Sequence, residues 1–91
     1  MTTKMAIYGG RVQGVGFRYT VKQIASGFDV QGTVENLPDG TVRVRAMAWD
    51  EEEVDAFLQE IEEGQLASFI REQQIEDIPE LDGVRGFSII R

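Results

Sequence analysis

Apolar residues along this chain repeat with two different spacings, which separate predicted strands from predicted helices. Residues 41–48 alternate, with Val42, Val44 and two alanines on one face and two arginines and a methionine on the other. This period of two is typical of a strand that buries one face. Short apolar runs bounded by glycine or turn residues predict four more strands, over residues 5–12, 30–36, 70–78 and 87–91. We expect the first of these to bend at Gly9 and Gly10, since glycine inside a strand often marks a bulge.

Two other segments place apolar side chains three or four positions apart, the spacing of a helix that buries one face. The first begins at Phe17 and continues to Phe28, with Gly27 marking its end. The second begins after Asp50 and buries four apolar side chains, Val54, Phe57, Leu58 and Ile61, before Gly64. Glu53 follows Asp50 by three residues, so we expect a capping box. Trp49 is expected to pack in the core or at the sheet edge.

The predicted order of elements is strand, helix, strand, strand, helix, strand, with a short fifth strand at the end. The segment Leu37-Pro38-Asp39-Gly40 is rich in turn residues and predicts a tight hairpin between the two middle strands. Two β-α-β units sharing one antiparallel sheet form a ferredoxin-like βαββαβ sandwich of the α+β class, with both helices on one face. We expect residues 1–91 to form a single domain, because 91 residues suit one hydrophobic core.

Composition narrows the possible chemistry more than it narrows the fold. The chain has no cysteine and no histidine, which excludes thiol nucleophiles, imidazole bases and the commonest transition-metal ligands. The formal net charge of −7 disfavours nucleic acid and anionic membranes as partners, but it permits a small anion held locally. No run approaches the ~20 apolar residues of a membrane span, and the N-terminus lacks a secretory signal. We therefore expect a cytoplasmic protein.

The chemically most informative segment is Gly10–Arg18, a glycine-bearing loop between the first strand and the first helix. Such a loop can present converging backbone N–H groups at a helix N-terminus, which together form a phosphate cradle. Arg18 in the first helical turn opposes the helix dipole, and a bound anion would offset that cost. The loop lacks the Lys-Ser/Thr of the Walker motif and the third glycine of the dinucleotide fingerprint, so a nucleotide is not expected. Alternatively, Gly14 and Gly16 only shape a turn while Arg18 faces solvent.

The second candidate is Asn36, which ends a predicted strand at the mouth of the hairpin. In the ferredoxin-like order this hairpin and the glycine-bearing loop can approach each other across neighbouring strands, which would bring Asn36 near Arg18. Its amide can position a water molecule there. Asparagine also commonly begins turns, and the residue by itself leaves both interpretations open.

These two segments together resemble the two signatures of the acylphosphatase family. The matching residues are Gly10-Arg11-Val12-Gln13-Gly14-Val15-Gly16-Phe17-Arg18 and Gly32-x-Val34-x-Asn36-x-x-Asp39-Gly40-Thr41-Val42. The resemblance covers nearly the whole chain in length and element order. It implies a small hydrolase, free of cofactors and independent of metal, that cleaves acyl phosphates into a carboxylate and inorganic phosphate.

The resemblance also implies roles for individual residues. Arg18 would grip the phosphate together with the backbone N–H groups of the loop, those of Gln13, Gly14, Val15, Gly16 and Phe17. Asn36 would orient the attacking water. The expected partners are a small-molecule acyl phosphate and the product inorganic phosphate, without nucleic acid or membrane, and the protein is expected to be a monomer. The chemistry agrees, since an acyl phosphate expels a stabilised carboxylate and needs little general-acid help.

Three residues depart from the family pattern: Thr33 replaces a frequent aromatic residue, Glu35 a frequent basic one, and Gln73 interrupts an apolar strand. Glu35 is expected to lower the affinity for anionic substrates. One alternative function is a relative of the acylphosphatase-like domains in hydrogenase-maturation carbamoyltransferases, which would handle carbamoyl phosphate. Another is a non-catalytic ferredoxin-like module that binds an anion, regulates or recognises RNA. Chain length and the lack of zinc-binding cysteines disfavour the first, and the net charge disfavours RNA.

Overall fold

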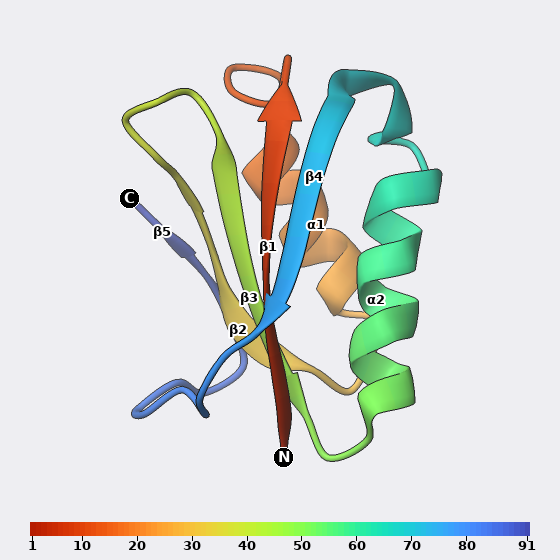
Figure 1. The fold of residues 1–91 in the computed structure, drawn as a ribbon, viewed down its shortest axis with the longest axis vertical. Coiled ribbons are helices and arrows are strands. Elements are labelled where there is room, and N and C mark those ends of the chain that lie inside the picture. Colours follow the sequence, from red (N-terminus) through yellow and green to blue (C-terminus); the bar gives the residue numbers. More distant parts are fainter.

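The computed structural model describes residues 1–91 and contains five strands and two α-helices (Figure 1). Their bounds are β1 (Thr2–Gly10), α1 (Phe17–Ala25), β2 (Gln31–Asn36), β3 (Val42–Ala48), α2 (Glu51–Glu63), β4 (Ile70–Asp77) and β5 (Phe87–Ile90), with a 3₁₀ turn at Ala67–Phe69 before β4. Every predicted strand and helix is present. The first helix is shorter than predicted, because the N–H groups of Gly27 and Phe28 bond three residues back and tighten the chain into turns.

The five strands form one sheet in the order β4-β1-β3-β2-β5. The first four pair antiparallel, in the order of the ferredoxin-like α+β fold. β5 runs parallel to β2, so the segment between β4 and β5 connects opposite edges of the sheet. The register between β1 and β4 shifts between Gly9 and Gly10, where the sequence predicts a bend.

Both helices cover one face of the sheet, and the core lies between the helices and the sheet (Figure 1). The alternation of β3 leaves Val42, Val44 and Ala46 fully buried on this face. The ring of Phe57 on α2 meets two other rings edge-on, with its centroid 5.9 Å from that of Phe28 and 5.4 Å from that of Phe87. These contacts join α2, the end of the first helical segment and β5, so the core holds β5 beside β2.

Two predictions about the start of α2 are wrong. Asp50 occupies the N-cap position in an extended conformation, but its side chain makes no capping hydrogen bond. Glu53 instead accepts a hydrogen bond from the Asp29 N–H at 2.7 Å, which ties the chain entering β2 to α2. Trp49 is 79% exposed rather than packed. It lies beyond Ala48, the last paired residue of β3, where the sheet no longer offers it a neighbouring strand.

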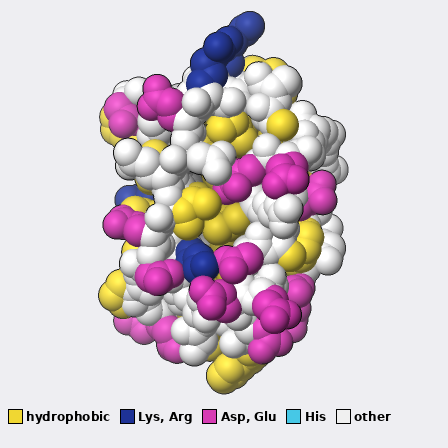
Figure 2. All heavy atoms as spheres, turned by 45° about the vertical axis from the view of Figure 1, so that its right-hand side comes forward, with side chains coloured by type: hydrophobic (Ala, Val, Ile, Leu, Met, Phe, Trp, Pro, Cys, Tyr) yellow, Lys and Arg dark blue, Asp and Glu magenta, His cyan; other side chains and the backbone are white.

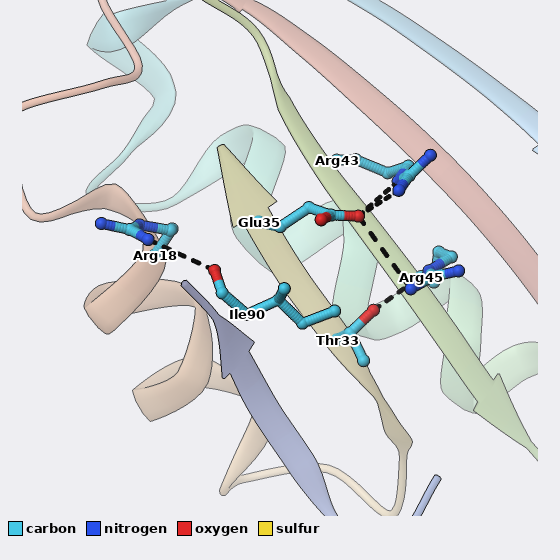
Figure 3. A network of polar contacts seen from close by, with 6 residues as sticks. All are labelled: Arg18, Thr33, Glu35, Arg43, Arg45 and Ile90. Carbon is cyan, nitrogen blue, oxygen red and sulfur yellow. Dashed lines mark hydrogen bonds and ion pairs between the residues drawn. The ribbon is translucent and has the colours of Figure 1, made fainter. Parts of the chain in front are cut away.

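The sheet face away from the helices carries a polar network (Figure 3). Glu35 on β2 accepts two hydrogen bonds from the Arg43 guanidinium on β3, one of them from Nε at 2.8 Å. Arg45 Nη2 lies 4.0 Å from the same carboxylate, and Arg45 Nε donates to Thr33 Oγ1 at 3.1 Å. Thr33 and Glu35, two departures from the family pattern, are therefore cross-strand partners of these arginines. The third departure, Gln73, lies on β4, an edge strand whose side chains are almost all exposed.

Acidic side chains gather on the face that carries α2 (Figure 2). Lys4 of β1 pairs with two of them, Asp55 at 2.6 Å and Glu51 at 3.0 Å. These contacts raise the pKa of Lys4, chiefly through the hydrogen bond to Asp55. Neither helix combines the length and the apolar character needed to cross a bilayer.

Candidate active site

A pocket of about 220 Å³ opens where the β1–α1 loop meets the ends of β2 and β5. The loop and the β2–β3 hairpin lie at the same end of the sheet (Figure 1). The polar lining comes from the two loop glycines, Arg18, Asn36 and Arg91, and the apolar and aromatic lining from Val12, Phe17, Tyr19 and Ile89. The structure thus brings Arg18 and Asn36 to one pocket, as the element order predicts.

The loop that lines this pocket carries a series of unpaired backbone donors. Gly14 and Gly16 have φ angles of +78° and +77°, in the left-handed region that disfavours other residues. The first helical hydrogen bond runs from the Thr20 N–H to the Gly16 carbonyl, and no N–H of residues 13–18 donates within the protein. These donors precede a helix whose N-terminus carries partial positive charge, so the loop suits an anion.

Arg18 is half-buried in the first turn of α1 and reaches across to β5. Its Nη1 donates to the Ile90 carbonyl oxygen at 3.3 Å (Figure 3). None of the ion pairs in the structure involves Arg18, which lies beyond 4.0 Å of every carboxylate. A neutral carbonyl therefore holds the guanidinium while its charge stays uncompensated. At a helix N-terminus this charge also opposes the dipole, so an anion in the pocket would relieve both effects.

Asn36 also lines the pocket. It is the last residue of β2, and its side chain lies on the helix-covered face beside that of Val34. Its Oδ1 atom is buried and has no hydrogen-bond donor. A buried acceptor without a partner costs about 1–3 kcal/mol. Such groups in folded proteins call for an explanation.

Two features of the site have no counterpart in the sequence analysis. The Gln13 side chain, expected to contribute only its backbone N–H, donates from Nε2 to the carbonyls of Leu37 and Thr41, both at 2.9 Å. The third wall comes from β5 through Ile89 and the following Arg91. No periodicity or spacing signals either contact, because both depend on where distant segments meet.

Glu35 is not among the lining residues, since it points to the other face of the sheet. No group of three or more carboxylates is placed to hold a metal ion.

Comparison with known proteins finds relatives of one family. The acylphosphatase family model matches residues 4–89. A Bacillus licheniformis acylphosphatase is 43% identical over 83 residues, which cover 91% of each chain. A Lacticaseibacillus paracasei acylphosphatase is 38% identical over 90 residues, covering 94% of this chain and 92% of the relative.

Solved structures show the same likeness. The crystal structure of a Bacillus subtilis acylphosphatase superposes with a TM-score of 0.88 at 33% identity, and the match covers the whole of both chains. Full-length HypF in a phosphate- and nucleotide-bound form matches with a TM-score of 0.80 at 30% identity, although this chain spans only 12% of it.

Fold and pocket therefore define a ferredoxin-like α+β protein that carries an anion-suited loop at the start of its first helix. The acylphosphatase family model matches nearly the whole chain, and a relative of that family is 43% identical over 91% of it. The chain belongs to the acylphosphatase family, a family of hydrolases.

Proposed function

We propose that the protein hydrolyses small acyl phosphates to a carboxylate and inorganic phosphate in the pocket between the β1–α1 loop, β2 and β5. One observation supports the proposal: Arg18, which makes no ion pair, the loop residues Gly14 and Gly16, whose N–H groups have no partner in the protein, and Asn36 all line one small cavity. The buried apolar residues form one core cluster, so we also propose that residues 1–91 act as one domain, and we propose that the protein is a monomer.

Arg18 and the loop would hold the phosphoryl group. A guanidinium has five N–H donors, and the Ile90 carbonyl uses one of them, so the others remain for phosphoryl oxygens. The backbone N–H groups of residues 13–17 supply further donors whose directions the folded loop already sets. Donors arranged before the reaction stabilise the developing charge without reorganising during it.

Asn36 would orient the attacking water. The water oxygen forms a bond to phosphorus while the bond from phosphorus to the acyl oxygen breaks, and the carboxylate leaves with that electron pair. The proton lost by the water passes to solvent or to the phosphate product. Because the leaving group is a stabilised carboxylate, positioning and charge stabilisation can drive this step without an imidazole or thiol.

Replacing Arg18 tests the proposal. Arg18→Ala removes a charged hydrogen-bond donor, which is worth about 1.5–3 kcal/mol, so kcat/KM for benzoyl phosphate should fall roughly 10- to 150-fold. Arg18→Lys should recover part of the loss, because lysine keeps the charge but lacks the fork of donors. Inorganic phosphate should raise the thermal midpoint of wild type more than that of Arg18→Ala.

The matched control is Arg85→Ala, which removes an exposed arginine that does not line the pocket. This variant should hydrolyse benzoyl phosphate as wild type does. Wild-type turnover by a folded Arg18→Ala protein would contradict the proposed site. A protein that binds phosphate but hydrolyses no acyl phosphate would instead be a non-catalytic anion-binding module.

A further inference from the structure

The side chain of Gln13 bridges the β1–α1 loop and the mouth of the β2–β3 hairpin. Its Nε2 donates to the Leu37 and Thr41 carbonyls, each at 2.9 Å. These carbonyls close the hairpin, because the Leu37 N–H also donates to the Thr41 oxygen at 2.8 Å. Leu37 directly follows Asn36. One side-chain amide thus joins the loop to the residue beside the proposed water-orienting asparagine.

No other hydrogen bond connects these two walls of the pocket. The loop N–H of Arg11 donates to Phe69, and the Arg18 side chain donates to Ile90, so both of these contacts lead away from the hairpin. The pairing of β1 with β3 ends at Tyr8 and Val42, before either wall begins. Without the Gln13 amide, the loop and the hairpin would be related only through packing and through the strands that carry them.

We propose that Gln13 is a positioning residue that sets the distance between the phosphate cradle and Asn36. This inference rests on the proposed function. The backbone N–H of Gln13 belongs to the cradle, while its side chain grips the hairpin, so one residue couples the two walls directly. In-line attack needs the water about 3–3.5 Å from phosphorus, and a misplacement of about 1 Å can cost roughly 10²-fold in rate.

The two hydrogen bonds of the Gln13 amide should position the loop more than they stabilise the fold, because both are exposed to solvent. Both carbonyls keep a second partner if the amide is lost, because the Leu37 oxygen also accepts from the Gly40 N–H and the Thr41 oxygen from the Leu37 N–H. Removing the amide therefore leaves no carbonyl orphaned. We expect a large change in turnover with a small change in the midpoint of urea unfolding.

Gln13→Met tests this proposal, because methionine has a similar length and volume but no donor. Steady-state hydrolysis of benzoyl phosphate should show kcat reduced roughly 10- to 100-fold, while inhibition by inorganic phosphate stays near wild type. Gln13→Asn, which keeps the amide but is one methylene shorter, should lose kcat in the same way. Gln59→Met removes an exposed glutamine on α2, away from the pocket, and should change neither quantity.

The decisive comparison is the double variant Gln13→Met/Asn36→Ala. If Gln13 acts by placing Asn36, the methionine substitution should lower kcat no further once Asn36 is gone. An equal loss in both backgrounds would overturn the proposal, as would unchanged kcat in both folded Gln13 variants or a phosphate inhibition constant raised as much as kcat falls. Failure of the proposed function has a different signature: folded Arg18→Ala and Asn36→Ala would both keep wild-type turnover.

Discussion

Replacing Gly16 with alanine tests what the left-handed turn at the start of α1 costs a residue that has a Cβ, in stability or in phosphate binding. Gly16 has φ +77° and ψ 19°, and an added Cβ would meet no atom within 4 Å. Steric clash therefore contributes nothing to the cost of Gly16→Ala. What remains is the strain of a left-handed backbone at a residue with a Cβ, about 1–2 kcal/mol.

This strain can lower either the free energy of unfolding or the affinity for phosphate. If the neighbouring chain holds the loop in place, the free energy of unfolding falls by about 1–2 kcal/mol and phosphate affinity is unchanged. If the loop relaxes instead, stability is kept, and phosphate binding weakens roughly 5- to 30-fold, since about 1.4 kcal/mol is a factor of ten. In both cases the phosphate-saturated variant should be less stable than saturated wild type by the same total, about 1–2 kcal/mol.

Urea unfolding, followed by far-ultraviolet circular dichroism with and without a fixed high concentration of phosphate, measures this total. Fluorescence is a poor probe here because the single tryptophan, Trp49, is 79% exposed in the folded chain. Gly27→Ala is the control, since Gly27 lacks a positive φ and its added Cβ would meet only the Ile24 oxygen at an ordinary 3.5 Å. A phosphate-saturated Gly16→Ala protein as stable as saturated wild type would refute the reasoning.

Two further predictions follow from buried polar groups. Asn36→Ala should lower kcat roughly 10²–10³-fold, by analogy with oxyanion-hole side chains, and change phosphate affinity little; a raised KM with kcat intact would show a binding or turn role instead. The free energy of unfolding should fall above about pH 10, because the pKa of Tyr8 is raised in the folded chain. Burial is the main cause, and the Glu62 carboxylate, which accepts a hydrogen bond from the Tyr8 hydroxyl at 2.9 Å, adds to it. The unfolded chain then loses the phenol proton while the folded chain keeps it, so the slope of stability against pH steepens from near zero at about pH 9 toward a fall of about 1.4 kcal/mol per pH unit by about pH 11. Urea unfolding between pH 9 and 11 measures this slope, which Tyr8→Phe should reduce; an equal slope in that variant would exclude Tyr8 as its source.

The elements of this fold and the candidates for its chemistry could be predicted from the amino-acid sequence. Strand and helix spacings are local properties of the sequence. The alternation of β3 and the apolar face of α2 could therefore be predicted without knowing how the two elements pack. Turn chemistry was equally local, and it located the hairpin after Asn36. Arg18 stood out because a cation in the first turn of a helix is unfavourable without an anion. Element order then predicted that Arg18 and Asn36 would meet, and the structure confirms that both line one pocket.

The distant groups that complete the site depend on how the folded chain packs. The Gln13 amide reaches the hairpin, and the Ile90 carbonyl holds Arg18, across 24 and 72 residues of sequence. Both acceptors are backbone carbonyls, which every residue carries, so no residue type marks them in the sequence. The partners of two glutamates could not be predicted from local spacing either. Strand register places Glu35 beside Arg43, and the packing of the chain before β2 against α2 places the Asp29 N–H beside Glu53. Local patterns define elements and chemical groups, whereas partners depend on how the whole chain packs.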